Sequence, residues 1–222
     1  MWVGAMAHCI IFGVFGETMT DWPEPTFGRT DWTLEASERL AEGFFQLDEL
    51  RLTHRGYQRE SVGPMLRELL VRAPAVVVIL CDLKRQQVAM VEQFRVGPAM
   101  SELDDSPWML EWVAGICEAN ESPLETCRRE VFEETGLSLD ADPQLVFTYY
   151  PSPGGSNELV FLYFAPCDLT KVERFRGQTN EYEDLKVHVI SIASAVEALQ
   201  TKKVNNAATI IGLQWLQLNI PK

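Results

Sequence analysis

A continuous apolar run marks residues 75–81, which read Ala-Val-Val-Val-Ile-Leu-Cys. A strand without polar positions is typical of the centre of a sheet that is covered on both faces, so this run predicts a buried strand. The polar residues that follow predict a turn, and residues 88–94 are the expected return strand of a hairpin. Similar apolar segments predict strands over residues 108–113, 145–150, 159–164 and 186–191.

Later segments of the chain have the pattern of helices. They cover residues 123–135, 192–200 and 207–218, and the last of them is rich in Ile and Leu. Strands and helices follow one another in mixed order. This order predicts a mixed α/β domain in which helices pack on a sheet.

Ahead of this domain, residues 34–72 are rich in strand-forming segments. A turn is expected near residues 55–57, and an extended run follows over residues 61–71. This part of the chain predicts a small antiparallel β layer. The predicted division is therefore an extension over residues 1–33, a small β-rich domain over residues 34–72 and the main domain over residues 73–222.

The extension is the least informative part of the chain. Residues 1–16 are apolar but short for a membrane span, and they lack the basic leader of a signal peptide. An extra strand, a partly disordered arm and an over-extended translation start are all compatible with residues 1–33. The pattern does not choose between these three alternatives.

The helix over residues 123–135 has well-marked ends. Ser122 is a favourable N-cap, Pro123 suits the first helical position, and Glu125 stands where a capping box needs an acidic side chain. Gly136 is a natural residue for the left-handed turn that ends a helix. Both ends of this helix are therefore predicted from local signals.

Acidic residues crowd the last two turns of this helix. Glu130, Glu133 and Glu134 lie at the negative end of the helix dipole, and Glu130 and Glu134 are repelling neighbours one turn apart. A helix selected for stability alone would carry Lys or Arg here. Carboxylate oxygens suit Mg²⁺ or Mn²⁺, so the cluster predicts a divalent metal site. The alternative is an ordinary acidic helix with a solvated face.

The spacing of residues around this helix resembles the Nudix box, Gly-x5-Glu-x7-Arg-Glu-U-x-Glu-Glu-x-Gly-U, in which U is a bulky aliphatic residue. Every defined position is matched, by Gly115, Glu121, Arg129, Glu130, Val131, Glu133, Glu134, Gly136 and Leu137. The resemblance implies the Nudix fold, an α/β/α sandwich with a mixed sheet, over the main domain. It also implies hydrolysis of a nucleoside diphosphate that is linked to another group.

The resemblance implies roles for residues of the box. Glu130 and Glu134 match metal-ligating carboxylates, and Glu133 is expected as an additional or supporting ligand. The backbone carbonyl of Ala114 matches a further metal ligand, and the expected metal is Mg²⁺, with Mn²⁺ as a possible substitute. Structural roles are expected for Gly115, Glu121, Arg129 and Gly136. Among these, Glu121 and Arg129 are expected to form a pair.

From about residue 43 to residue 220, the chain resembles the bacterial ADP-ribose pyrophosphatases within this family. The closer resemblance lies in a Ser-Pro-Gly-Gly loop at Pro153, an acidic loop at residues 181–184 and the Asn-rich start of the last helix. It implies Mg²⁺-dependent hydrolysis of ADP-ribose to AMP and ribose 5-phosphate. Glu181 is the expected general base, and Glu183 is the alternative base. Rival hypotheses are cleavage of UDP-glucose or GDP-mannose, and a non-catalytic ADP-ribose-binding sensor.

The same resemblance places several residues at the substrate. Arg67 and Arg95 match positions that contact phosphate, for which the planar fork of arginine is suited. Glu111 and Glu158 match positions near the terminal ribose, and Phe44 matches an aromatic residue that stacks on adenine. Because Phe44 precedes the hydrolase domain, a homodimer with swapped N-terminal layers is expected.

Composition narrows the expected partners and compartment. The net charge of −13 argues against nucleic acid or an anionic membrane as a partner. It leaves room for a small phosphorylated substrate, because bound divalent cations reverse the local field. The five cysteines include no C-x-x-C pair, which favours a reducing, cytoplasmic location over a disulfide framework.

Overall fold

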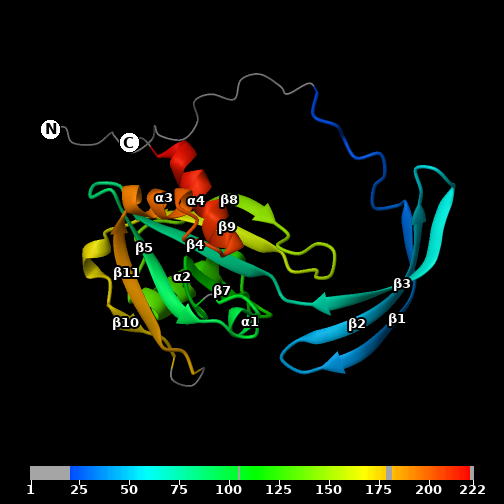
Figure 1. The fold of residues 1–222 in the computed structure, drawn as a ribbon, viewed down its shortest axis with the longest axis horizontal. Coiled ribbons are helices and arrows are strands. Elements are labelled where there is room, and N and C mark those ends of the chain that lie inside the picture. Colours follow the sequence, from blue (N-terminus) through cyan, green and yellow to red (C-terminus); the bar gives the residue numbers. More distant parts are fainter. Residues whose placement is uncertain (1–20, 105, 179–181, 221–222) are drawn as a thin grey trace.

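A computed structural model describes residues 21–104, 106–178 and 182–220, and these residues form two sheets (Figure 1). The first is an antiparallel sheet of three strands, β1 (Trp32–Glu42), β2 (Gln46–Arg55) and β3 (Ser61–Val71). The antiparallel N-terminal layer predicted from the sequence is therefore present. Its first strand was not singled out by the hydrophobic pattern, because every residue of β1 is exposed.

The second sheet forms the body of the molecule and has eight strands. These are β4 (Ala75–Asp82), β5 (Gln87–Phe94), β6 (Trp108–Glu111), β7 (Val113–Ile116), β8 (Gln144–Tyr149), β9 (Val160–Pro166), β10 (Phe175–Arg176) and β11 (Leu185–Ser191). The path runs β10-β11-β5-β4-β9-β8, while β6 pairs with β5 and β7 pairs with β4. The sheet is mixed, because β4 runs parallel to β9 and antiparallel to β5.

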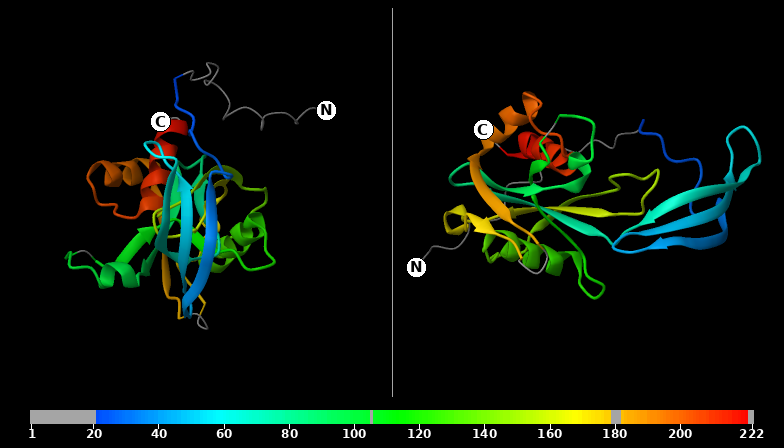
Figure 2. Two further views of the ribbon diagram at one scale, coloured as in Figure 1. Left: turned by 90° about the vertical axis from the view of Figure 1, so that its right-hand side faces the viewer. Right: turned by 60° about the horizontal axis from the view of Figure 1, so that its bottom comes forward.

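Helices cover both faces of this sheet (Figure 2). The helical elements are α1 (Val96–Ala99), α2 (Pro123–Thr135), the 3-10 turn η1 (Leu169–Lys171), α3 (Ile192–Gln200) and α4 (Ala207–Asn219). Val131 of α2 packs in one apolar cluster with Val76 of β4, whereas Leu213 of α4 packs on the opposite face with Val77. The architecture is the predicted α/β/α sandwich with a mixed sheet.

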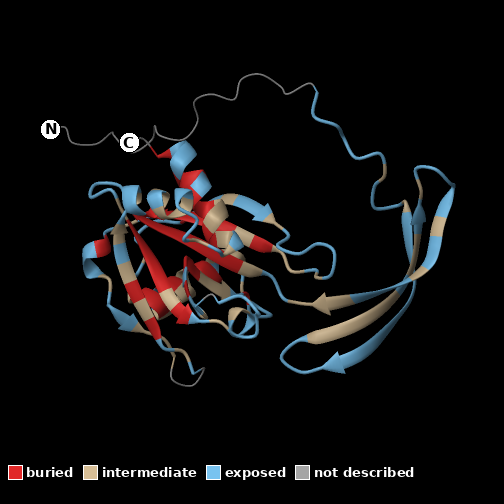
Figure 3. Ribbon diagram, viewed as in Figure 1, coloured by how far each residue is buried: buried red, intermediate tan, exposed pale blue. Residues whose placement is uncertain are grey.

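The buried core lies inside this sandwich (Figure 3). Alternate residues of β4 enter the two apolar clusters, as the continuous apolar run predicted. A fully buried aliphatic side chain contributes roughly 1.5–3 kcal/mol to folding, so the core holds α2 firmly against the sheet. The three-stranded sheet, in contrast, is mostly exposed or half-buried.

One predicted strand is divided in two. The stretch expected as a single strand over residues 108–113 splits into β6 and β7, which pair with different neighbours. Trp112 stands at the break and is 1 % exposed, and its indole Nε1 donates to the carbonyl oxygen of Thr209 in α4 at 3.3 Å. This long-range contact, which the local pattern cannot reveal, sets the residue apart from both strands.

The three-stranded sheet stands to one side of the body (Figures 1 and 2). Hydrogen bonds join the end of β3 to the loop before β9, from Leu70 N to Gly155 O at 2.8 Å and from Arg72 N to Asn157 Oδ1 at 2.8 Å. Across the described ranges, no helix is both long and apolar enough to cross a membrane.

Candidate active site

The helix α2 begins and ends where its sequence signals predict. Glu125 N donates to the Ser122 hydroxyl oxygen, and Ser122 N donates to the Glu125 carboxylate at 2.8 Å, which forms the capping box. Gly136 ends the helix with a φ of 75°, a conformation that costs glycine little. These two caps fix where the helix begins and ends, and so the positions of the glutamates on its last two turns.

A cation meets the acidic end of α2, and it comes from another element. Arg176 of β10 donates from Nη2 to Phe132 O at 2.9 Å and from Nε to Glu133 O at 3.2 Å. Phe132 O also accepts from Gly136 N at 2.9 Å, whereas Glu133 O lies in the last turn, where the intrahelical donors run out. The guanidinium therefore offsets the unfavourable placement of glutamates at the negative end of the dipole.

Arg129 gathers the acidic side chains of the box. It donates to both carboxylate oxygens of Glu121, at 2.9 and 2.8 Å, so the expected ion pair is present. Its Nη1 also donates to Glu130 at 2.7 Å and to Glu133 at 3.0 Å. The paired guanidinium lowers the pKa of the Glu121 carboxyl to about 2. Arg129 thus ties the loop before α2 to the face that carries the glutamates.

Buried Glu134 and partly buried Glu130 form an acidic pair. Glu134 is only 2 % exposed, and burial raises its pKa well above the usual value, with the charge of Glu130 adding to the rise. Burial also raises the pKa of Glu130 to about 7. One oxygen of Glu134 accepts a hydrogen bond from Ala114 N at 3.3 Å, which fixes it against β7. A cation placed beside these two carboxylates would favour their ionised forms, so the pair is suited to bind one.

The backbone of β7 approaches this pair closely because residue 115 has no side chain. A Cβ built on Gly115 would lie 1.7 Å from Oε1 of Glu130, far inside any contact distance. The Glu130 carboxylate therefore occupies the space that a side chain would take. Of the glycines in the motif, this one is explained by close approach, whereas Gly136 is explained by its backbone conformation.

The chemistry of these groups fits a small, hard cation such as Mg²⁺ or Mn²⁺. All the available donors are oxygens, and two of them belong to carboxylates whose charge burial disfavours. Within the described ranges, no group of three or more His, Cys, Asp or Glu side chains could hold a metal ion alone. Backbone carbonyl, water or substrate oxygens would have to complete the coordination shell, as is usual for Mg²⁺.

The acidic loop before β11 reaches the same pair. Glu183 lies close enough to Glu130 and Glu134 for its charge to raise the pKa of both. Its N–H donates to Gln178 O at 3.1 Å. The other expected base, Glu181, lies outside the described residues.

Arg95 is held at the end of β5 by a buried acid. Its Nε donates to Oε2 of Glu111 at 2.7 Å, and Glu111 is 6 % exposed. The other oxygen of Glu111 accepts a hydrogen bond from the side-chain amide of Asn206. The charge of Arg95 partly opposes the rise in the pKa of Glu134, which puts Arg95 within electrostatic reach of this glutamate.

The remaining predicted substrate residues lie on or beside the three-stranded sheet. Arg67 of β3 is exposed and donates to Leu66 O at 2.7 Å. Phe44, in the β1–β2 turn, is 84 % exposed and packs edge-on against Phe45. Glu158 forms an ion pair with Arg72 at 3.1 Å at the junction with the body. The contacts described here for Arg67 and Phe44 are with their own neighbours in the three-stranded sheet and its turn, not with residues of the box.

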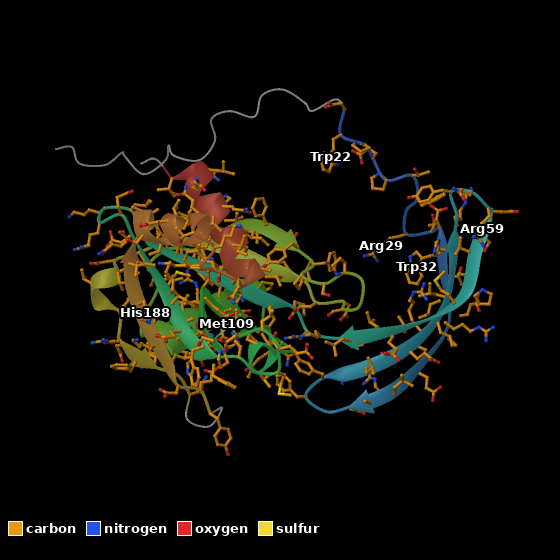
Figure 4. The ribbon with its side chains drawn as sticks, viewed as in Figure 1. Trp22, Arg29, Trp32, Arg59, Met109 and His188 are labelled. Carbon is orange, nitrogen blue, oxygen red and sulfur yellow. The ribbon has the colours of Figure 1, made fainter. Side chains whose placement is uncertain are left out.

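In Figure 4, Trp32 of β1 and Arg59 of the β2–β3 turn lie away from Met109 of β6. The labelled His188 lies on the main sheet and contacts Glu92 at 2.7 Å rather than the glutamates of α2.

Sequence reasoning missed Arg176, Arg72 and Asn206. Arg72 follows the apolar end of a strand and Arg176 lies two residues after Arg174, and nothing in their neighbourhood along the chain points to their partners. Asn206 carried one signal, because an asparagine just before a helix is a favoured N-cap. Its second contact, with Glu111, joins residues 95 positions apart and has no local signature.

Comparisons with known proteins agree with this geometry. The family model described as NUDIX domain matches residues 71–211. An ADP-ribose pyrophosphatase of Escherichia coli (strain K12) is 37 % identical over 194 residues, covering 87 % of this chain and 91 % of the relative. A GDP-mannose pyrophosphatase of Enterobacter sp. (strain 638) is 31 % identical over 154 residues, covering 69 % and 78 %. A crystal structure of an ADP compounds hydrolase has a similar fold, with a TM-score of 0.62, 16 % identity, and coverage of 84 % of this chain and 95 % of that one.

Proposed function

The chain belongs to the Nudix family and is a hydrolase, and from this premise we propose that it cleaves ADP-ribose to AMP and ribose 5-phosphate with the help of Mg²⁺. The observation that carries the proposal is the pair formed by buried Glu134 and partly buried Glu130, set against the backbone of Ala114 and Gly115. The similarity to ADP-ribose pyrophosphatases over most of the chain supports the choice of substrate.

In this proposal Glu130, Glu134 and the carbonyl oxygen of Ala114 hold Mg²⁺, which Mn²⁺ could replace. Glu133 serves as a supporting acid, because its side chain is more exposed than that of Glu130, at 25 % against 13 %. Bound Mg²⁺ would neutralise the charge of the diphosphate and make a coordinated water more acidic. The chain itself supplies carboxylates on a helix that is held at both ends, by the Ser122 capping box at its start and by Gly136 and Arg176 at its end.

The attacking water must also lose a proton to a base. We assign this role to the acidic loop before β11, with Glu181 as the base and Glu183 as its alternative. The electrostatic coupling of Glu183 to Glu130 and Glu134 supports a position for this loop beside the reaction. A carboxylate on a loop can approach the water when substrate is bound.

Arg95 and Arg67 are proposed to bind the diphosphate, Phe44 to stack on adenine, and Glu158 to lie near the terminal ribose. Because Arg67 and Phe44 lie on the three-stranded sheet, we propose a homodimer in which this sheet completes the active site of the partner. The large exposed side chains of Phe44, Leu66 and Leu34 support a role in association.

Mixed dimers test the swapped arrangement. A Glu134→Gln subunit combined with an Arg67→Ala subunit would form one doubly defective site and one intact site if Arg67 acts in trans. Dimers co-expressed with two tags and purified through both should then regain about half of the wild-type activity per dimer. Dimers in which neither site is restored would show that Arg67 acts within its own chain.

The substrate itself is tested by turnover of ADP-ribose, UDP-glucose, GDP-mannose and diadenosine polyphosphates, with and without Mg²⁺. We expect the highest kcat/KM with ADP-ribose and loss of activity with a chelator. The similarity to GDP-mannose pyrophosphatases makes GDP-mannose the principal rival, and equal or better turnover of it would overturn the choice of substrate. Binding of ADP-ribose without Mg²⁺-dependent turnover would instead indicate a sensor.

A further inference from the structure

The side-chain amide of Asn206 makes two different contacts. Its Oδ1 accepts a hydrogen bond from Thr209 N at 2.9 Å, which caps the first turn of α4. Its Nδ2 donates to Oε1 of Glu111, on a different element. The two contacts fix the orientation of the amide, because a flipped amide would turn its oxygen toward a carboxylate and its NH₂ toward an N–H donor.

Only the first of these contacts is needed to start the helix. Aspartate and serine cap helices as well as asparagine does, because each offers an oxygen to the free N–H groups. The start of α4 is also anchored to the sheet near the break between β6 and β7, through Trp112 Nε1 and Thr209 O at 3.3 Å. The donor function of Asn206 is therefore not explained by the helix.

The contact with Glu111 leads to the proposed phosphate ligand. Glu111 is buried and uses one oxygen for Asn206 and the other for Nε of Arg95, at 2.7 Å. A carboxylate held by only one of these donors could rotate about its last bonds and carry the guanidinium with it. A Glu111 carboxylate that is held by both donors keeps the guanidinium of Arg95 in one position. The side chain of Arg95 is 43 % exposed there.

We propose that Asn206 is a positioning residue, which orients Arg95 through Glu111 so that the guanidinium meets the diphosphate of the substrate. The proposal rests on the function proposed above and extends it to the start of the C-terminal helix. It also gives Glu111 a different role from the one expected by resemblance, since both of its oxygens are directed to Arg95 and Asn206 rather than to a ribose.

Two variants separate the donor from the cap. Asn206→Ser keeps an oxygen for Thr209 N but loses the reach to Glu111, and Asn206→Asp keeps the cap but sets a second carboxylate beside the first. Both should raise the KM for ADP-ribose by about tenfold while changing kcat by less than about threefold, because Arg95 would bind ground state and transition state alike. The matched control is Ser191→Ala, which removes the N-cap of α3 and should leave KM unchanged.

A double-mutant comparison tests whether Asn206 acts through Arg95. In an Arg95→Ala background, Asn206→Ser should add less than about twofold to KM, because the group that it positions is gone. Full multiplication of the two effects would overturn the proposal, and so would a wild-type KM in Asn206→Asp, which cannot donate. Thermal unfolding of each variant checks that the caps are intact.

Binding of inorganic pyrophosphate keeps this test independent of the substrate. Calorimetry with the Mg²⁺-loaded protein should show about tenfold weaker binding in Asn206→Ser than in the wild type or in Ser191→Ala. If the wild type does not cleave ADP-ribose, the proposed function fails, yet the pyrophosphate affinities still decide the role of Asn206. Equal affinities in all three proteins would overturn that role.

Discussion

Gly115 and Glu130 share a single volume, because a Cβ on residue 115 would lie 1.7 Å from Oε1 of Glu130. Alanine at this position must therefore displace either the carboxylate or the strand β7. We expect Gly115→Ala to lower kcat/KM by at least about a hundredfold, since misplacement of a catalytic group by about 1 Å costs that much. Steady-state kinetics measures the loss, and far-UV circular dichroism should stay close to wild type.

The control for that substitution is Gly28→Ala, because a Cβ on Gly28 meets nothing within 4 Å. This variant should keep full activity. A Gly115→Ala protein with normal turnover would mean that the carboxylate can move without loss, which would contradict the proposed role of Glu130.

Glu134→Gln removes one charge from the buried pair and leaves its shape almost unchanged. We expect turnover with Mg²⁺ to fall by about three orders of magnitude, because a metal-holding carboxylate is lost. Glu197→Gln, an exposed position on α3, is the control and should be neutral. Near-normal turnover of Glu134→Gln would disprove the metal assignment.

The acidic pair should make the metal-free protein less stable as pH rises. Burial raises the pKa of Glu130 from 4.5 to about 7, so in that interval the folded chain binds a proton that the unfolded chain does not. Stability in the presence of a chelator should therefore fall between these pH values, and Mg²⁺ should restore more of it at the upper end. Melting temperatures across this range, with chelator and with Mg²⁺, measure both trends.

Glu130→Gln is the matching control, because an amide has no proton to gain. Its melting temperature in chelator should depend less on pH than that of the wild type, and Mg²⁺ should stabilise it less. If Mg²⁺ raised the melting temperature equally in both proteins, the cation would be bound elsewhere.

Glu121 should behave in the opposite sense. Arg129 lowers the pKa of Glu121 from 4.5 to about 2, so the ion pair stabilises the fold fully above the upper value and is lost as pH falls toward the lower one. We expect Glu121→Gln to lose about 1–3 kcal/mol of unfolding free energy near neutral pH and progressively less in acid. Urea unfolding at several pH values measures the difference, with the exposed Glu118→Gln as the neutral control.

Arg176→Ala should loosen the last turn of α2. The carbonyl of Glu133 would lose its donor, the carbonyl of Phe132 would keep only Gly136 N, and the nearby glutamates would lose a compensating charge. Hydrogen exchange of residues 132–136 should accelerate, and kcat/KM should fall by about tenfold. Arg174→Ala is the control, since that guanidinium packs over Phe175 instead. Unchanged exchange in Arg176→Ala would show that the helix end does not depend on this arginine.

The box helix could be predicted from the sequence because its signals are local. Ser122, Pro123 and Gly136 each act within a few residues, and the structure places both helix ends where these signals indicate. The apolar run of β4 was equally clear, because alternate residues face two covered surfaces. The family motif then added what spacing alone could not, the chemical meaning of the glutamates.

Contacts between distant segments could not be predicted in this way. The break at Trp112 depends on a hydrogen bond to Thr209, and the position of Arg95 depends on Glu111 and Asn206. The exposed strand β1 gave no apolar signal, since its pairing with β2 rests mainly on backbone hydrogen bonds. Long-range contacts of this kind determine the geometry of the site, and the local sequence pattern gives little sign of them.

The cation that completes the acidic end of α2 arrives late in the chain, 43 and 44 positions after the carbonyls that it contacts. Folding order follows from this distance. The first turn of α2 can form once its own residues have been synthesised. The turn that carries the glutamates is stabilised only when β10 has been synthesised and packs against it. A nascent chain halted before β10 would thus contain the whole motif and no working site, and we expect a peptide of residues 115–137 to fray where its glutamates begin.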